Sequence, residues 1–201
     1  QMKKKLRVHF LGVGGAGMSA VALLAKHAGY EVSGCDLQET TPYLDKLKKE
    51  GVPVLVGHDE SHLKNTDLFT ITAAAFFQSQ DQPEFIGGQK SGKMIQWQEF
   101  LGTYLHKGKR VIGICGTNGK STTTSLAASV LEEAGLDPSA MVGATVKKWG
   151  ANYRTGKSDL FVTEADEFFN NFLAYHPDII ILNNIEFDHP DFFKDFPAVI
   201  K

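Results

Sequence analysis

A lysine and a row of hydroxyl residues follow a glycine-rich turn near the middle of the chain. The candidate nucleotide-binding residues of this turn are Gly116, Thr117, Asn118, Gly119, Lys120, Ser121 and Thr122. Backbone N–H groups in such a turn point into one concavity, and the N-terminus of a following helix adds partial positive charge. Lys120 can reach the terminal phosphates of a nucleotide triphosphate, and Ser121 can bind magnesium. The turn therefore predicts binding of ATP with Mg²⁺.

This turn departs from a strict P-loop, because Ile114 stands where the first glycine is expected. Its surroundings favour the same interpretation, since residues 110–115 read as a buried strand. Apolar residues then repeat with helical spacing, at Ala127, Val130, Leu131 and Ala134. The alternative is a glycine-rich turn that only begins an ordinary helix.

A second glycine-rich turn follows the first predicted strand, residues 6–11, and contains G-x-G-x-x-G as Gly12, Gly14 and Gly17. Asp36 closes the next predicted strand. The glycines allow close approach of a diphosphate, and Asp36 can accept a hydrogen bond from a ribose hydroxyl. The pattern by itself is typical of NAD or FAD binding, and a UDP-sugar offers the same diphosphate and ribose. A tight turn that binds nothing is the remaining alternative.

Acidic residues and a histidine follow two later predicted strands. Glu164 ends the strand at residues 160–164, and His189 comes after the strand at residues 178–182. The carboxyl ends of parallel strands meet at one edge of a sheet, so we expect both side chains to face the phosphates and, with Ser121, to hold magnesium. Lys120, Glu164 and His189 are thus the predicted catalytic residues. The alternatives are a solvated acidic loop and a loop or packing histidine.

Strands alternate with helices along the chain. Strands are expected at residues 6–11, 31–35, 52–56, 68–73, 94–95, 110–115, 141–142, 160–164 and 178–182. The alternation predicts an α/β protein in which a Rossmann-like parallel-sheet domain, residues 1–107, precedes a P-loop-type α/β domain, residues 108–201. The second domain has few strands for a nucleotide-binding sheet and is expected to be truncated. We therefore expect either association through an exposed sheet edge or disorder there, and the oligomeric state stays open.

Composition narrows the possible partners. The chain has 201 residues and a formal net charge of -2, which gives no electrostatic reason to expect nucleic acid. No apolar run approaches the roughly 18 to 20 residues of a membrane helix, and the basic start lacks the apolar stretch of a signal peptide. Cys35 and Cys115 are predicted to be packing residues. We expect a cytoplasmic protein with no membrane partner.

Together these motifs resemble the Mur ligase family, whose ATP-dependent enzymes add amino acids to UDP-N-acetylmuramic acid. The resemblance rests on residues 116–122, 164–167 and 184–189, which occur in the family's order. The first glycine loop and residues 142–152 are most similar to members that add L-alanine to UDP-N-acetylmuramate. Residues 187–193 instead resemble members that recycle murein tripeptide.

The resemblance implies a ligase of peptidoglycan synthesis that works through an acyl phosphate and releases ADP and phosphate. The amine would come from L-alanine or from a peptide. The residues it assigns to UDP-N-acetylmuramate are Gly12, Gly14, Gly15, Ala16, Gly17, Met18, Asp36, Thr72 and Ala73. Because the family's C-terminal domain lies outside these residues, we expect the 201-residue piece to bind the UDP-sugar but to ligate poorly. An NAD-binding oxidoreductase and a non-catalytic sugar-nucleotide-binding module are the rival classes.

Overall fold

The computed structural model describes residues 5–72, 81–166, 172–188 and 193–200. It divides into two compact units, Gln1–Phe100 and Leu101–Lys201. The sequence-based boundary lay a few residues further on, between residues 107 and 108. Each unit is built around one five-stranded sheet, so the α/β prediction is confirmed.

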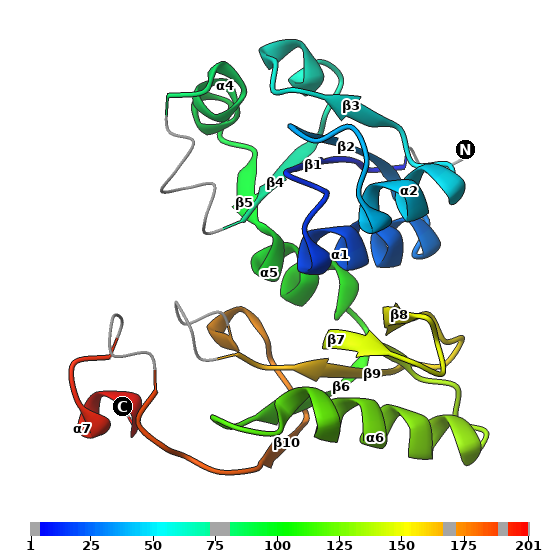
Figure 1. Ribbon diagram of the computed structural model, residues 1–201, viewed down its shortest axis with the longest axis vertical. Helices are drawn as coiled ribbons and strands as arrows, with labels where there is room; N and C mark the ends of the chain where they lie inside the picture. Colours follow the sequence, from blue (N-terminus) through cyan, green and yellow to red (C-terminus); the bar gives the residue numbers. More distant parts are fainter. Residues whose placement is uncertain (1–4, 73–80, 167–171, 189–192, 201) are drawn as a thin grey trace. The chain divides into compact units, whose positions relative to one another are not determined.

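The first unit is a parallel sheet with the strand order β3-β2-β1-β4-β5. Its strands are β1 (Arg7–Leu11), β2 (Glu31–Asp36), β3 (Val54–Val56), β4 (Leu68–Ile71) and β5 (Met94–Gln96). Its helices are α1 (Ala16–His27), α2 (Pro42–Lys49), α4 (Pro83–Lys90), α5 (Trp97–Phe100) and the 3-10 turn η1 (Glu60–Leu63). Figure 1 shows α1 and α2 on one face of the sheet and α4 on the other. This is the Rossmann-like arrangement that the alternation of elements predicts.

Side chains of β1 alternate between the two faces of this sheet, as the pleat requires. Phe10 meets Phe100 of α5 edge-on, at 5.7 Å between ring centroids. Leu11 packs on the other face with Phe69 and Phe85, and Phe85 belongs to α4. His9 faces the same way, because its ring stacks on Phe69. A histidine is therefore buried between the sheet and α4.

The second unit has the strand order β10-β6-β9-β7-β8. Its elements are the π-helical turn η2 (Leu101–Leu105), β6 (Arg110–Cys115), α6 (Lys120–Glu133), β7 (Ser139–Val146), β8 (Ala151–Arg154), β9 (Leu160–Glu164), β10 (Ile179–Leu182) and α7 (Phe196–Ile200). Four of these strands pair in parallel, whereas β8 runs antiparallel to β7. The strand pattern in the sequence predicted a parallel sheet and did not include β8. Because β8 runs antiparallel to β7, the second sheet is mixed.

The predicted apolar stripe of α6 is only partly buried: Ala127 and Leu131 pack against the core of the second unit. Thr124 and Ala128 are fully buried, whereas Val130 is 59% exposed and Ala134 is exposed as well. Thr124 tolerates burial because its hydroxyl donates to the Lys120 carbonyl oxygen at 2.8 Å, within the helix. A threonine whose hydroxyl is hydrogen-bonded thus lies between α6 and the sheet, where an apolar residue would be expected.

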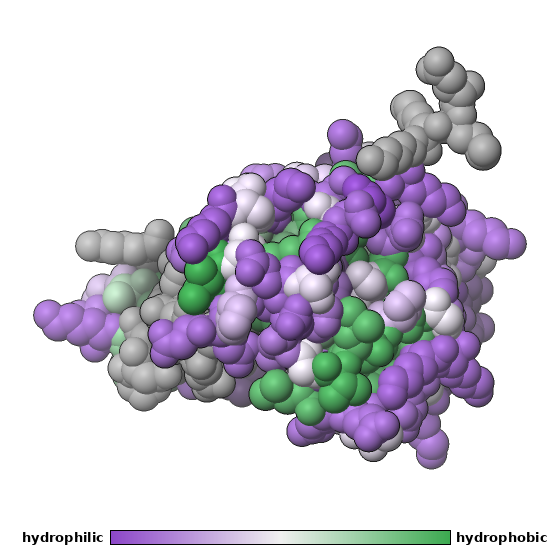
Figure 2. Space-filling view, turned by 90° about the horizontal axis from the view of Figure 1, so that it is seen from above, coloured by the Kyte–Doolittle hydropathy of each residue, from purple (hydrophilic) through white to green (hydrophobic). Residues whose placement is uncertain are grey.

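The β10 strand forms one edge of the second sheet. All four of its residues are apolar and exposed, from 37% for Ile181 to 61% for Ile180. The exposed sheet edge that the strand count predicts is therefore present. Figure 2 shows one face of the molecule as mainly hydrophilic, with apolar areas between the polar side chains. Among the described residues, no helix has the length and apolar character needed to cross a membrane.

Candidate nucleotide-binding sites

The lysine-bearing turn joins the end of β6 to the start of α6. Gly119 precedes the helix with a left-handed backbone, at a φ of 81°. No side chain caps this end of α6, and its first turn contains no acidic residue. The first N–H groups of a helix have no partner within the helix, and they favour anions. Because no side chain caps this end of α6, its first N–H groups can bind an anionic ligand.

Lys120 lies over the turn. Its Nζ donates to the Gly116 carbonyl oxygen at 2.7 Å and lies 3.6 Å from a carboxylate oxygen of Asp166. Asp166 follows β9, the strand beside β6. The positive charge is therefore held at the mouth of the turn, where phosphate oxygens would meet it.

Ser121 and Glu164 meet beside Gly143 of β7. The Gly143 N–H donates to Glu164 Oε1 at 2.5 Å. A Cβ atom at residue 143 would lie 2.8 Å from Glu164 Oε2 and 3.2 Å from Ser121 Oγ, so a larger residue there would displace the Glu164 carboxylate. Hydroxyl and carboxylate oxygens are the ligands that magnesium prefers. The donor set therefore fits Mg²⁺, and it lies at the carboxyl end of β9.

Residues after β10 hold the turn from the opposite side. The Asn118 N–H donates to Asn184 Oδ1 at 2.9 Å, and Nδ2 of both Asn183 and Asn184 donates to the Asn118 carbonyl oxygen at 3.2 Å. The Glu186 N–H donates to Thr117 Oγ1 at 2.9 Å. These contacts join segments that are 65 to 69 residues apart in the chain. They fix the turn's backbone from outside.

A cavity of about 170 Å³ lies next to this turn, with Gly116 and Thr117 on one side. Its other walls include the apolar residues Phe172, Leu182 and Ile185. Pockets for whole ligands usually measure about 300 to 1,000 Å³. This cavity can therefore receive only part of a nucleotide, such as a flat apolar ring.

The first glycine-rich turn joins β1 to α1. The N–H groups of Gly12 and Val13 donate to the Cys35 carbonyl oxygen at 2.9 and 3.0 Å. Gly15 precedes α1, which has no side-chain cap and no acidic residue in its first turn. Like the second turn, this one presents a helix N-terminus without a capping side chain.

Asp36 of β2 is bound to the first turn rather than only facing it. Its Oδ2 accepts from the Gly14 N–H at 2.9 Å, and its Oδ1 accepts from the Gln38 N–H at 3.0 Å. A carboxylate has about four acceptor sites, so room for a ribose hydroxyl remains. Met18 is buried, with 1% of the residue exposed, and its assignment to the UDP-sugar stays a prediction.

The remaining predicted residues have less to report. Thr72 follows β4 and is partly buried, and Ala16 begins α1. Ala73 and His189 lie outside the described residues. The structure thus brings Lys120, Ser121 and Glu164 to the carboxyl ends of the inner strands of the second sheet. The placement of His189 there stays a prediction.

Sequence reasoning missed Gly143, Asn183 and Asn184 as parts of this site. The signal for Gly143 was a glycine directly after the predicted strand at residues 141–142, and a glycine within a strand often marks a close approach of another group. The signal for the asparagines was their position directly after the strand at residues 178–182. Amides carry both donors and acceptors, which suits them to hold a loop backbone.

Two α/β units, each with a glycine-rich strand-to-helix turn at the carboxyl ends of parallel strands, define an α/β protein of the nucleotide-binding type. Residues 7–107 match the Mur ligase family, catalytic domain, and residues 114–201 match the Mur ligase middle domain. The chain belongs to the Mur ligase family, as its motifs predict.

Curated relatives point to one branch of this family. The chain is 40% identical over 190 residues to the UDP-N-acetylmuramate--L-alanine ligase of Caldicellulosiruptor saccharolyticus, covering 94% of this chain and 41% of that protein. It is 42% identical over 193 residues to the ligase of the same name from Paenarthrobacter aurescens, covering 96% of this chain and 41% of that protein. The chain thus spans about two fifths of the length of these relatives.

The solved structures that resemble this chain come from two branches of the family, one named for a tripeptide and one for alanine. A UDP-N-acetylmuramate:L-alanyl-gamma-D-glutamyl-meso-diaminopimelate ligase from Neisseria meningitides matches with a TM-score of 0.85 and 32% identity, over 97% of this chain and 65% of that one. A UDP-N-acetylmuramate-alanine ligase from Thermotoga maritima matches with a TM-score of 0.78 and 29% identity, over 92% of this chain and 43% of that one.

Proposed function

We propose that the whole protein joins L-alanine to UDP-N-acetylmuramate in an ATP-dependent reaction of peptidoglycan synthesis. The observation that carries this proposal is the position of Lys120, Ser121 and Glu164 together at the carboxyl ends of strands in the second sheet. The relatives named above, which are L-alanine ligases, supply the substrate class. The first unit would bind the UDP-sugar, and the second unit would bind ATP.

The residues of the second unit divide the work of holding ATP. Backbone N–H groups of Gly116, Thr117 and Gly119 and the N-terminus of α6 would bind phosphate oxygens, and Lys120 would neutralise the charge that develops on them. Ser121 and Glu164 would hold Mg²⁺, which draws negative charge away from the phosphates when it is bound. His189 remains a proposed third ligand.

The proposed ligation has two steps. A carboxylate oxygen of the muramyl group attacks the γ-phosphorus of ATP, the bond to the bridging oxygen breaks, and ADP leaves. The amine nitrogen of alanine attacks the resulting acyl phosphate, an amide bond forms, and phosphate leaves with the bonding electron pair. The amine loses a proton to solvent or to a base. Positioning and charge neutralisation supply most of the catalysis in such a reaction.

The first unit offers a matching cradle for a diphosphate. Its turn presents the N-terminus of α1, and Asp36 keeps the turn in place through the Gly14 N–H. The candidate contacts are Gly12, Gly14, Gly15, Ala16, Gly17, Met18, Asp36, Thr72 and Ala73. We propose that these residues bind UDP-N-acetylmuramate.

A murein peptide ligase is the second candidate function. The Neisseria protein, named as a UDP-N-acetylmuramate:L-alanyl-gamma-D-glutamyl-meso-diaminopimelate ligase, matches with the higher TM-score of the two structures described. Residues 187–193 are similar to that branch. Curated relatives at 40 to 42% identity favour L-alanine. Phosphate release from the complete protein, compared with L-alanine and with the tripeptide, decides between them.

Ligand-induced thermal stabilisation of the 201-residue chain tests the binding assignments. UDP-N-acetylmuramate and Mg²⁺ with ATP should each raise the melting temperature, since a ligand that binds only the folded state stabilises it. Lys120→Ala should abolish the response to ATP and keep the response to the UDP-sugar. Stabilisation by NADH alone would instead support an oxidoreductase. A Lys120→Ala variant with an unchanged ATP response would contradict the proposed site.

A further inference from the structure

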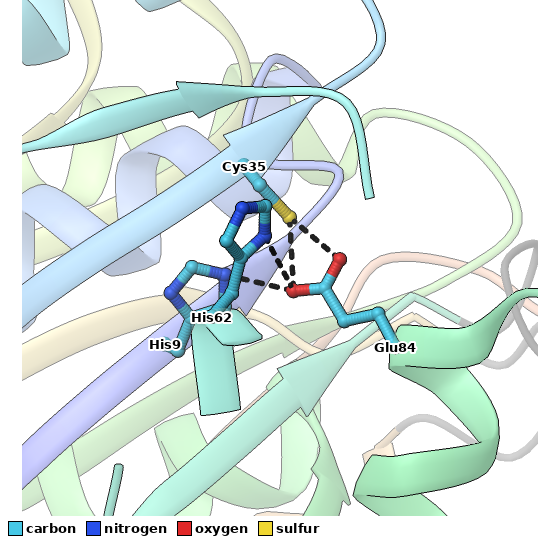
Figure 3. A group of neighbouring side chains, drawn as sticks. All are labelled: His9, Cys35, His62 and Glu84. Carbon is cyan, nitrogen blue, oxygen red and sulfur yellow. Dashed lines mark hydrogen bonds and ion pairs between the residues drawn. The ribbon is translucent and has the colours of Figure 1, made fainter. Parts of the chain in front are cut away.

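Four potential metal ligands meet in the interior of the first unit, on the α4 side of its sheet. They are His9 of β1, Cys35 of β2, His62 of η1 and Glu84 of α4. Their ligand atoms all lie within 4.8 Å of one another. Figure 3 shows the two imidazole rings and the sulfur converging on the carboxylate. We call this group the His-Cys-His-Glu cluster.

The pairwise distances suit a single central ion. Glu84 Oε1 lies 3.1 Å from His9 Nε2 and 3.2 Å from His62 Nδ1, and Cys35 Sγ lies 3.2 and 3.3 Å from the two carboxylate oxygens. Around a tetrahedral zinc ion, with bonds of about 2.0 to 2.3 Å, neighbouring ligand atoms lie about 3.3 to 3.6 Å apart. The pairs that include Glu84 would have to open by a few tenths of an ångström, and the other pairs, which all lie within 4.8 Å, would settle around the ion.

Nε2 of His9 lies close to the Glu84 carboxylate without the geometry of a hydrogen bond. His9 is 0% exposed, and its Nε2 makes no hydrogen bond among the described residues, although Glu84 Oε1 is close. Its other nitrogen, Nδ1, lies 2.8 Å from Ser33 Oγ. Metal-binding histidines usually have such a partner on the second nitrogen, which fixes the ring. His9 therefore points an oriented ring nitrogen at the Glu84 carboxylate and the cluster.

A second partner orients the carboxylate. His58 Nδ1 lies 3.1 Å from Glu84 Oε2, whereas His9 and His62 approach Oε1. Glu84 itself is 0% exposed. A buried carboxylate is costly unless its charge is compensated. His58 can hold Oε2 while Oε1 faces the other ligands.

The donor set selects the ion. One thiolate and one carboxylate would neutralise a divalent cation, which favours binding in a buried site. Thiolate and imidazole ligands suit zinc and similar transition metals, whereas magnesium and calcium prefer oxygen. Without a cation, burial and the charge of Glu84 raise the pKa of the Cys35 thiol. Binding would release the thiol proton, as metal binding to cysteine does.

We propose that the His-Cys-His-Glu cluster is a structural zinc site that ties β1, β2, η1 and α4 together. The four ligands come from four elements, so a bound ion would cross-link most of this face of the sheet. The Cys35 carbonyl oxygen also accepts from the Gly12 and Val13 N–H groups. A metal on Cys35 would therefore steady the backbone that the first glycine-rich turn rests on.

Cobalt titration of chelator-treated protein tests this proposal, since four-coordinate Co²⁺ reports its ligands by absorption. We expect one equivalent of Co²⁺ to bind with a thiolate-to-cobalt charge-transfer band, and Zn²⁺ to displace it and raise the melting temperature. Cys35→Ser should lose the band and weaken binding by at least about 100-fold, more than the loss of an outer partner. Ser33→Ala should weaken binding by about 10- to 100-fold.

Matched controls separate this cluster from other sites. Cys115→Ser removes the other cysteine and should keep the band, and His27→Gln removes an exposed histidine and should keep the affinity. The absence of a sulfur band from the unaltered protein, or an equal band in Cys35→Ser, would overturn the proposal. If Cys35→Ser does not fold, X-ray absorption of the zinc-loaded unaltered protein decides instead. One sulfur among nitrogen and oxygen ligands supports the site, and a shell without sulfur refutes it.

Discussion

The two glycine-rich turns share a backbone arrangement and differ in the charge around it. Both lead from a parallel strand into a helix that has no capping side chain. In the first unit an anion, Asp36, is bound to the turn, whereas in the second a cation, Lys120, lies over it. Only the second turn also has Ser121 and Glu164 beside each other. The backbone thus provides a general anion site, and the side chains decide whether it suits a diphosphate or a metal-bound triphosphate.

Buried histidines make a second contrast between the units. His9 of the first unit lies 2.8 Å from Ser33 Oγ and 3.1 Å from the Glu84 carboxylate. His106 of the second unit packs against Phe161 and Tyr175, and neither of its nitrogens makes a hydrogen bond among the described residues. Burial, with a smaller effect of His176, lowers the pKa of His106 to about 4. Acid should therefore weaken the second unit through this residue.

The largest effect is expected from titration of His106. The unfolded chain binds a proton here near pH 6.5, whereas the folded chain binds it only near pH 4. Stability should therefore fall as the pH drops between these values, by about 3 kcal/mol at 1.36 kcal/mol per pKa unit. Urea unfolding of the wild type and of His106→Phe, measured from pH 7 to pH 4, gives this term as a difference. Parallel profiles for the two proteins would show that His106 is not buried as a neutral ring.

Gly143→Ala should come next, because it acts on the second turn alone. The new Cβ would push against Glu164 Oε2 and Ser121 Oγ. Binding of ATP in the presence of Mg²⁺ should weaken by about 10- to 100-fold, or about 1.4 to 2.7 kcal/mol. Calorimetric titration with and without a chelator measures the change. Ala144→Ser, at the exposed neighbouring position, should bind ATP normally; an equal loss there would point to a general effect on β7.

Gly14→Ala is the corresponding change in the first turn. Its Cβ would lie 2.7 Å from Asp36 Oδ2, so the turn or the carboxylate must move. We expect binding of UDP-N-acetylmuramate to weaken by about 10-fold, or about 1.4 kcal/mol, with ATP binding unchanged. The same calorimetric titration with each ligand measures this. If Gly14→Ala and Gly143→Ala each weakened both ligands, the assignment of one ligand to each turn would be wrong.

The smallest effect is expected at a helix that does have a cap. Thr41 Oγ1 accepts from the Leu44 N–H at 3.0 Å at the start of α2. Thr41→Ala should lower the free energy of unfolding by about 1 kcal/mol and leave both ligand affinities unchanged. Urea unfolding measures the first and thermal shift the second. A loss of ligand binding in this variant would mean that capped and uncapped helix ends do not have separate roles.

Local patterns predicted the strands and both turns, because glycine spacing and apolar periodicity lie within short segments. Thr41 and Pro42 are local signals of the same kind, an N-cap residue followed by proline at the first helical position, and α2 begins there. The β8 strand was missed because Ala151–Arg154 is mixed in polarity and pairs only with β7. The role of Gly143 depends on the pairing of β7 with β9, where Met141 lies opposite Thr163. Such register between distant segments is not written in either segment alone.

The same limit applies to the His-Cys-His-Glu cluster. Cys35 read correctly as a buried residue, and its burial is complete. Its neighbours His9, His62 and Glu84 come from separate elements, with no metal-ligand spacing in the sequence. Only the closure of α4 and η1 over the sheet brings the four together.

The hydrogen bonds that Asn183 and Asn184 make to Asn118 have a consequence for synthesis on the ribosome. Its partner Asn184 lies 66 residues further along the chain. At about 5 to 20 residues per second, translation needs several seconds to cover that interval. During this time the lysine-bearing turn has emerged without the asparagines that shape it. A nascent chain should therefore acquire its nucleotide-binding geometry late, when the strand bearing those amides joins the sheet.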